Sequence, residues 1–160
     1  MQVKRIRDFK TLLASAARTA TGNGDAVRLQ FLVSAFAFVL DVTAAAEDVG
    51  DSLDVYVQTK IDGTNWLDVQ HFTQVLGNGG TKRYVAKVAA GAALTEFETG
   101  AALGAAAKRD LIGDEWRVRW VIVDDAGTGS GSGTGSGEGS GAGSAADNVS
   151  FTFSVRAIPM

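Results

Sequence analysis

The chain contains one histidine, His71, and no cysteine. A histidine can act as a general base, but a serine hydrolase of the common α/β type also needs a Gly-x-Ser-x-Gly elbow, which this sequence lacks. One histidine without any thiolate does not make a zinc site. The lack of cysteine also excludes disulfides and a cysteine nucleophile. We therefore expect His71 to be a packed or rim residue and not a catalytic base.

Several acidic residues have types and spacings that could bind a cation or cleave a glycosidic bond. Asp62, Asn65 and Asp68 gather around a turn and offer oxygen ligands suited to calcium. Their spacing lacks the fuller ligand set of an EF-hand loop, and Asp and Asn also form turns without a metal. The acidic pairs Asp114-Glu115 and Asp124-Asp125 flank one strand, where solubilising a turn is the simpler role. We expect no metal and no cofactor.

Residues 127–143 place glycine at every odd position. A phosphate-binding loop would end in Gly-Lys-Ser/Thr before a helix, whereas this tract runs into Gly143-Ser144-Ala145. Two interpretations remain open. The tract can be a solvated, flexible loop, or an extended segment whose bare face lets another chain approach closely.

The strand at 116–123 carries the sequence's main hint of nucleic-acid binding, because Arg117 and Arg119 alternate with Trp116 and Trp120. Side chains of a strand alternate between its faces, so the arginines lie opposite the tryptophans. That arrangement indicates a core face and a charged face, not a basic groove lined with aromatic rings. The net charge of −3 is also too small to imply a polyionic partner.

These residues must be positioned by strands. The hairpin at 53–75 alternates apolar and polar residues up to a turn at Asp62-Gly63, whose glycine accepts the positive φ of hairpin turns. The return strand carries Trp66 and Phe72 with irregular spacing, which predicts a bulge near Asp68. We expect Trp66 to seal one end of the core.

Other stretches also predict strands. Residues 27–42 reverse their alternation near Ser34-Ala35, as in a strand that bulges or bends from one sheet to another. Trp116 and Trp120 are expected in the core, and the strand at 148–158 is expected to pair with 116–123. A single helical turn is expected near 44–48. In the section that follows the strand at 82–90, alanine and lysine favour a short helix at 101–108, whereas Leu94, Phe97 and the Leu111-Ile112 pair favour a short strand and a covering loop.

The pattern predicts an all-β chain of 160 residues that forms one domain, 1–160. About seven to nine strands predict an antiparallel β-sandwich of jelly-roll or Greek-key type. A long Gly/Ser-rich loop, the insertion at 126–146, joins the last two strands, and residues 1–20 form an N-terminal strand or arm. An immunoglobulin-like sandwich is the alternative, although its usual Cys-Trp-Cys arrangement is absent.

The basic N-terminus does not predict a signal peptide, because Asp8 and Lys10 interrupt the region that should be apolar. The longest apolar run, Phe31 to Leu40, is much shorter than the roughly 20 residues of a membrane span. It is expected to be a strand buried on both faces.

Three segments resemble small structural proteins of tailed bacteriophages. They are TKIDGTNWLDVQHFTQV, GGTKRYVAKV and DLIGDEWRVRWVI, within a resemblance that covers roughly residues 25–123 and 148–158. The glycine tract has no counterpart in that pattern, and Asp-Gly-x-x-Trp hairpins also occur in sialidase-like repeats and carbohydrate-binding modules. The matching residues are Thr59, Asp62, Gly63, Trp66, Asp68, Phe72, Thr73, Lys82, Arg83, Tyr84, Gly113, Asp114, Arg117 and Val118.

The resemblance implies a virion component without enzymatic activity, made in the host cytoplasm and located on the capsid surface. Its expected role is that of a capsid decoration (cement) or minor capsid protein, which binds the major capsid protein and copies of itself, as a trimer or other cyclic oligomer. The candidate inter-subunit contacts are Lys4, Arg5, Arg7, Lys10, Gly129, Gly135 and Gly141.

Two alternatives remain open. One is a carbohydrate-binding module on the virion surface, in which Tyr56, Trp66 and His71 would be exposed stacking residues. The other is a tail-tube or head–tail connector component.

Overall fold

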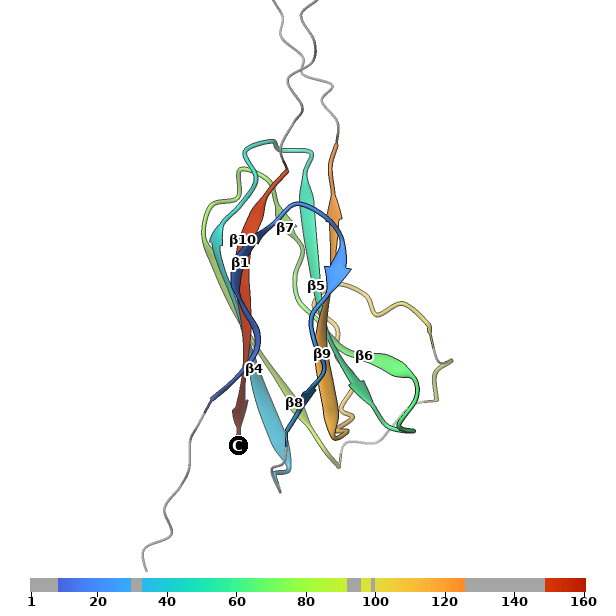
Figure 1. Cartoon of the computed structure of the whole chain (residues 1–160). Helices are drawn as coiled ribbons and strands as arrows, with labels where there is room; N and C mark the ends of the chain where they lie inside the picture. The colour runs from blue at the N-terminus through green and yellow to red at the C-terminus, as the bar shows by residue number, and fades with distance from the viewer. Residues whose placement is uncertain (1–8, 30–32, 92–95, 99, 126–148) are drawn as a thin grey trace, which may run out of the picture.

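The computed structural model describes residues 9–29, 33–91, 96–98, 100–125 and 149–160 (Figure 1). Strands dominate this part of the chain and assemble into two sheets. The strands are β1 (Lys10–Arg18), β2 (Gly22–Asn23), β3 (Val27–Arg28), β4 (Ala35–Ala44), β5 (Ser52–Lys60), β6 (Trp66–His71), β7 (Val75–Leu76), β8 (Lys82–Ala89), β9 (Glu115–Val123) and β10 (Phe151–Pro159).

A four-stranded sheet has the order β1-β10-β4-β8, and a six-stranded sheet has the order β2-β9-β5-β6. Two short strands complete the second sheet, where β3 pairs with β9 and β7 pairs with β5. All of these pairings are antiparallel. The prediction of an all-β, antiparallel chain is confirmed.

The described residues contain no helix, so the helical turn expected near 44–48 is wrong, and of the two interpretations of 101–108 the covering loop is the one found. The first segment continues β4 as far as Ala44, and the second is held against β6 by backbone hydrogen bonds. Within the part of the chain that the structure describes, no helix has the length and apolarity that a membrane crossing requires.

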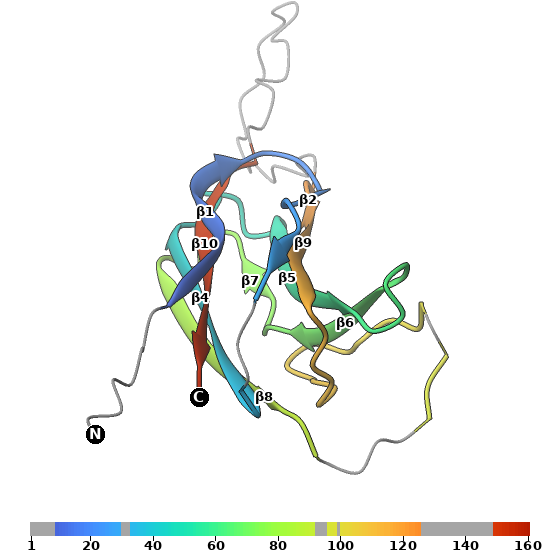
Figure 2. The same ribbon diagram turned by 60° about the horizontal axis from the view of Figure 1, so that its bottom comes forward.

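The inward faces of the two sheets meet in one apolar core (Figures 1 and 2). Trp116 of β9 lies fully buried, with its ring 5.3 Å from that of Phe36 and 5.2 Å from that of Phe38, both on β4. A second contact joins Trp120 of β9 to Phe153 of β10, with ring centroids 5.9 Å apart. The predicted core positions of both tryptophans are confirmed, because strand alternation turns every second residue of β9 inward.

The stretch at 27–42 is two strands in different sheets. β3 belongs to the six-stranded sheet and β4 to the four-stranded sheet, so the reversal of alternation near Ser34-Ala35 does mark a change of sheet. β4 buries alternate residues completely and leaves Ala37, Val39 and Asp41 partly exposed. The expected burial of both of its faces is therefore wrong.

The last strand is paired differently from expectation. β10 lies between β1 and β4 in the four-stranded sheet, whereas β9 lies in the other sheet. The connection between β9 and β10 therefore passes from one sheet to the other and is not a hairpin loop. Most of that connection, including the insertion at 126–146, lies outside the described residues.

The hairpin of β5 and β6 has the predicted bulge. The register shifts between the pairs Val57–Gln70 and Gln58–Asp68, so Val69 has no residue of β5 directly opposite it. The irregular spacing of the return strand is thereby explained, because Val69 turns inward and is fully buried, as is Phe72 just after β6.

Candidate functional site

The outer face of the six-stranded sheet carries an ordered set of polar and aromatic side chains. β5 lies between β6 and β9, and cross-strand pairing aligns three residues at each of three levels. We call these levels the polar ladder. From one end to the other, its rungs are His71–Tyr56–Arg119, Asp68–Gln58–Arg117 and Trp66–Lys60–Glu115.

The first rung is a stack. The ring of Tyr56 lies 3.9 Å from the ring of His71 and 3.8 Å from the guanidinium carbon of Arg119. Because His71 is on β6 and Arg119 is on β9, the two groups cover opposite faces of the tyrosine ring. Burial, followed by the charge of Asp54, raises the pKa of the Tyr56 phenol.

His71 makes two hydrogen bonds from a buried ring. Nδ1 lies 2.8 Å from the carbonyl oxygen of Leu103, and Nε2 lies 2.9 Å from Oδ1 of Asp54. A carbonyl oxygen and a carboxylate oxygen are both acceptors, so each ring nitrogen faces an acceptor. The other oxygen of Asp54 accepts a bond from Gln74. His71 thus links the sheet to the segment at 100–112, and both of its ring nitrogens have a partner within the chain.

The second rung is a hydrogen-bonded chain. Gln58 donates from Nε2 to Oδ1 of Asp68 at 2.7 Å and accepts at Oε1 from Nε of Arg117 at 2.7 Å. The second carboxylate oxygen of Asp68 accepts from Arg119 at 3.0 Å, which ties this rung to the first. Burial lowers the pKa of Arg117 below its ordinary value.

The third rung places Trp66 among cations. The Lys60 ammonium lies 4.7 Å from the Trp66 ring and the Arg117 guanidinium lies 4.4 Å from it. Lys60 also pairs with Glu115 at 3.0 Å, and Lys60, ahead of Arg28, lowers the pKa of that carboxyl. Trp66 is partly exposed on the outer face. The expectation that it seals the end of the core is wrong, because the register of β6 turns it outward opposite Lys60.

A covering segment, residues 100–112, lies along the free side of β6. Its backbone exchanges hydrogen bonds with the strand, from His71 N to Ala107 O at 3.0 Å and from Arg109 N to Val69 O at 2.8 Å. The Arg109 side chain bonds to the carbonyls of Asp68 and Ala101. The edge of β6 is therefore occupied by the chain itself.

The tip of the hairpin is a turn and not a cation site. Both carboxylate oxygens of Asp62 accept hydrogen bonds, from the backbone N–H groups of Thr64 and Asn65 and from the Asn65 amide, at 2.7 to 2.9 Å. Those bonds lower the Asp62 pKa to about 2. Gly63 adopts φ = +74°, as its predicted role in the turn requires. Asp68, the third candidate ligand, is turned instead toward Gln58 and Arg119.

The two acidic pairs at the ends of β9 do not form a catalytic couple. Glu115 is held by Lys60 and Arg28, and the Asp114 carbonyl accepts from Leu29 N. At the other end, the backbone N–H of Asp125 donates to Asp51 at 3.2 Å. Among the residues that the structure describes, no group of three or more His, Asp or Glu side chains could hold a metal ion.

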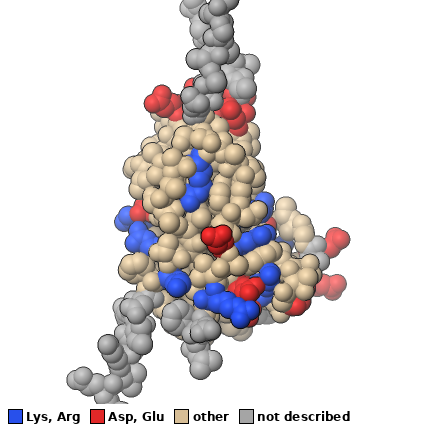
Figure 3. Space-filling model, viewed as in Figure 1, with Lys and Arg blue, Asp and Glu red and all other residues tan. Residues whose placement is uncertain are grey.

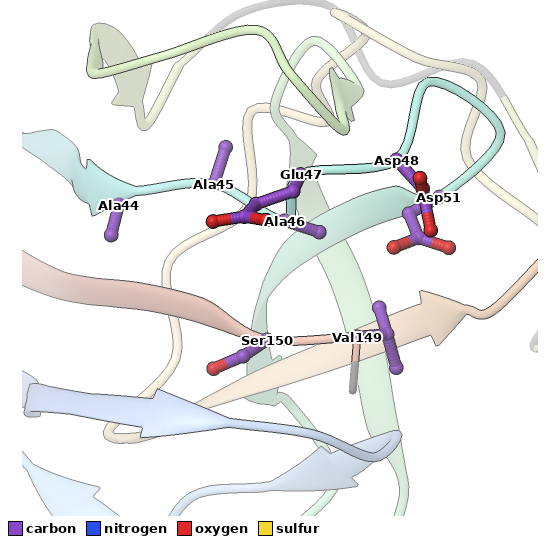
Figure 4. A pocket seen from close by; sticks show the side chains of 8 residues that line it. All are labelled: Ala44, Ala45, Ala46, Glu47, Asp48, Asp51, Val149 and Ser150. Atoms are coloured by element: carbon purple, nitrogen blue, oxygen red, sulfur yellow. The ribbon is translucent and has the colours of Figure 1, made fainter. Parts of the chain in front are cut away.

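An acidic hollow of about 510 Å³ lies at the end of the molecule where β4 leads into β5 (Figure 4). Glu47, Asp48 and Asp51 contribute carboxylates, and the remaining lining residues are small or apolar. Asp51 is buried, and its Oδ1 accepts a hydrogen bond from the backbone N–H of Asp125. The hollow shows no group arranged around a ligand, so we assign it no binding role.

Of the candidate inter-subunit contacts, Lys10 is exposed at the first position of β1, an edge strand of the four-stranded sheet. The others lie outside the described residues. Arg117 and Arg119 lie on the face opposite the tryptophans of β9, as predicted. Their stacking on Trp66 and Tyr56 of other strands could not be predicted from the sequence of β9, because it depends on the cross-strand register.

No protein-family model, no curated protein and no solved structure matches this chain. The geometry is therefore the basis for any functional assignment, together with the sequence resemblance described above.

Proposed function

We propose that this protein is a non-enzymatic structural component of a virion, namely a capsid decoration (cement) or minor capsid protein that binds and stabilises the major-capsid lattice as an oligomer. The observation that carries the proposal is the order of the strands in the two sheets. The sequence resemblance to small structural proteins of tailed bacteriophages agrees with it.

The strand order supports a jelly-roll sandwich. In a jelly roll, eight strands form two Greek keys, and first and last strands are neighbours in one sheet. If β2 with β3 and β6 with β7 each count as one strand, the sheets read first-eighth-third-sixth and second-seventh-fourth-fifth. This order, in which most successive strands go to alternate sheets, supports the jelly-roll assignment. Viral capsid proteins, lectins and cupins use this architecture, so the order favours a structural or binding role without choosing between them.

The polar ladder favours the structural role over glycan binding. A sugar stacks on a free aromatic face, yet both faces of Tyr56 are covered and His71 is buried. Trp66 is the remaining candidate, and it is already flanked by Lys60 and Arg117. The polar groups of the ladder find their hydrogen-bond and ion-pair partners within the chain. A fully satisfied polar network makes the sheet rigid, as a structural role requires.

The distribution of charge supports repeated contacts between neighbours. In the view of Figure 3, acidic residues gather at the end of the molecule that carries Glu47, Asp48 and Asp51, while the middle and the opposite end carry lysines and arginines together with acidic residues. An acidic end and a remainder of mixed charge make the molecule polar, which allows copies or lattice partners to meet in one orientation. The N-terminal residues and the glycine tract remain our proposed contacts with those neighbours.

Electron microscopy of capsids tests this proposal directly. Capsids of the encoding phage that lack the protein should, after mixing with purified protein, show regular density at repeated lattice positions. The native mass should be that of a cyclic oligomer. Density confined to the neck or tail would indicate the connector or tail-tube role. No association with particles, together with binding on a glycan array, would replace the proposal by the carbohydrate-binding role.

A further inference from the structure

Strand β8 forms one edge of the four-stranded sheet, beyond β4 (Figures 1 and 2). In an antiparallel pair, the N–H and C=O groups of successive residues point alternately toward and away from the partner strand. Ala90 N donates to Ser34 O next to β4, whereas Ala89 N donates away from β4 to Oδ1 of Asp110. By the same alternation, the backbone groups of Arg83, Val85 and Lys87 point outward.

The covering segment occupies the edge of β6, and its described residues make one hydrogen bond to β8. It forms backbone hydrogen bonds with β6 at Ala107 and Arg109 and then presents the Asp110 carboxylate to Ala89 N at 3.0 Å. No described residue bonds to the outward backbone groups of Arg83, Val85 and Lys87. We call these three positions the open edge.

Space for another strand exists beside the open edge. A groove of about 440 Å³ runs between β8 and the end of β6, with Tyr84 and Ala86 on one wall and Phe72 and Thr73 on the other. A strand added to β8 would direct every second side chain into this groove and would direct the others over the outer face of the sheet. Val85 lies midway along β8, with its side chain on that outer face, and is 68% exposed.

The charges along the open edge determine the chemistry of the partner. At one end, Arg83 and Arg156 share the single carboxylate of Asp41, at 2.7 and 3.5 Å. At the other end, Lys108 forms an ion pair with Asp110 at 2.9 Å, and Lys87 also interacts electrostatically with that carboxylate. Among these described groups, each end therefore has one positive charge in excess, with apolar Val85 between them.

A second copy of β8 does not fit this edge. Pairing about a twofold axis through Val85 would place Arg83 directly opposite Lys87 twice, and like charges opposite each other destabilise a sheet. Charged residues on edge strands commonly prevent such self-pairing. The same charges favour a strand of the opposite sign.

We propose that the open edge of β8 binds an extended segment of another protein, in which two acidic side chains flank an apolar one at alternate positions. The segment adds a fifth strand to the four-stranded sheet, with its acidic residues opposite Arg83 and Lys87 and its apolar residue opposite Val85. This proposal does not rest on a virion role, because a short peptide tests it in isolation.

The probe is the capped peptide Thr-Glu-Thr-Val-Thr-Glu-Thr. Its alternate side chains have the order Glu, Val, Glu in either strand direction, so it can bind parallel or antiparallel to β8 with the same side chains on the outer face. In amide NMR spectra of the full chain, its addition should shift Arg83, Val85 and Lys87 most. A peptide with lysine in place of both glutamates should bind at least tenfold more weakly. Equal binding of the two peptides, shifts that lie elsewhere, or no shift at millimolar peptide would overturn the proposal.

Two substitutions and a matched control complete the test. Val85→Pro removes one outward N–H without touching the bonds to β4 and should weaken peptide binding at least tenfold. Lys87→Glu should reverse the preference between the two peptides, and it keeps the test decisive if Val85→Pro fails to fold. Lys82→Glu, on the same strand but on the other face, should leave the preference unchanged. Unaltered binding by Lys87→Glu, or dimerisation of the free chain through β8, would contradict the assignment.

Discussion

Asp62 determines the shape of the hairpin tip through hydrogen bonds to its carboxylate. The bond from Asn65 N, at 2.7 Å, contributes most to lowering its pKa, followed by the bond from Thr64 N. Each bond is made to the ionised form, so the folded chain holds this carboxyl ionised more strongly than the unfolded chain does. The side chain is therefore a source of acid sensitivity confined to one turn.

The Asp62 carboxyl should titrate near pH 2 in the folded protein, against an ordinary value of 3.8. Because the folded pKa is the lower one, its contribution to stability is fully present above about pH 4 and is lost as pH falls toward 2. Carboxyl-detected NMR titration measures the pKa. Replacement by alanine should make the melting temperature fall less steeply between pH 4 and 2 than in the wild type. A titration at the ordinary value would contradict this account.

Gly113 is required for close packing between the chain before β9 and the end of β5. A Cβ on this residue would collide with the carbonyl oxygen of Lys60, which is backbone and cannot rotate away. The same short stretch holds Trp116, whose indole N–H donates to Gly113 O at 3.0 Å. The resemblance had marked Gly113 by its place in a motif, and the structure supplies a physical reason for it.

Gly113→Ala should lower the free energy of unfolding by about 2–3 kcal/mol, as overpacking against rigid atoms does. Gly104→Ala is the matched control, because no atom lies within 4 Å of the added methyl group and its φ is not positive. The control should change stability by about 0.5 kcal/mol or less. Urea denaturation measures both variants, and equal effects would show that the predicted collision is relieved without cost.

At the scale of elements, β9 shows what alternation can and cannot predict. Its inner residues follow from the period of two, and Trp116 and Trp120 are buried as expected. The partners on its outer face do not follow from its own sequence. Arg117 stacks on Trp66 and Arg119 on Tyr56 only because β9 pairs with β5, and β5 pairs with β6, in one specific register. Local pattern therefore predicts which face is buried, whereas side-chain contacts require the register.

The tryptophans of β9 and β6 should behave oppositely when replaced. Trp116→Phe should lower the free energy of unfolding by about 2 kcal/mol, because it opens a cavity against Phe36 and Phe38 and leaves the Gly113 carbonyl without its donor. Trp66→Phe should cost less than about 1 kcal/mol, since its ring lies at the surface. Chemical denaturation gives both values.

Fluorescence quenching provides an independent check on the same pair. Acrylamide should quench the wild type in two components, and Trp66→Phe should remove the accessible one while Trp116→Phe removes a shielded one. If Trp66→Phe were the more destabilising variant and removed a shielded component, the outward orientation of Trp66 would be wrong.

At the scale of the whole molecule, the order of strands could not be read from the sequence. The strands at 116–123 and 148–158 are consecutive, and consecutive strands joined by a loop commonly form a hairpin. Here β10 pairs with β1 and β4, which are far from it in the sequence. A local pattern of residues does not predict which distant strands will pair. A glycine-rich connection offers no turn chemistry that would decide between the two arrangements. The all-β class was predictable, whereas the order on which the proposed function rests was not.

Removal of residues 127–143 should therefore leave the fold intact. β9 ends at Val123 in one sheet and β10 begins at Phe151 in the other, and packed sheets lie only about 10 Å apart, a span that the remaining residues can cross. Each halving of a flexible loop changes the closure free energy by only about 0.6 kcal/mol. The melting temperature of the deletion variant should stay within a few degrees of the wild type, and a large decrease would show that the tract supports the fold.

Capsid occupancy, measured from particle composition by gel and by electron microscopy, should instead fall in the deletion variant if the tract contacts a neighbouring subunit. A scrambled tract of the same length and composition separates pattern from length. If glycine at every odd position lets a neighbour approach closely, the scrambled chain should bind as poorly as the deletion. If the scrambled chain binds as the wild type does, length and composition matter and the position of the glycines does not. Unchanged occupancy of the deletion variant would remove the tract from the contact surface and leave the N-terminal segment and the sheet edges as the surfaces to test.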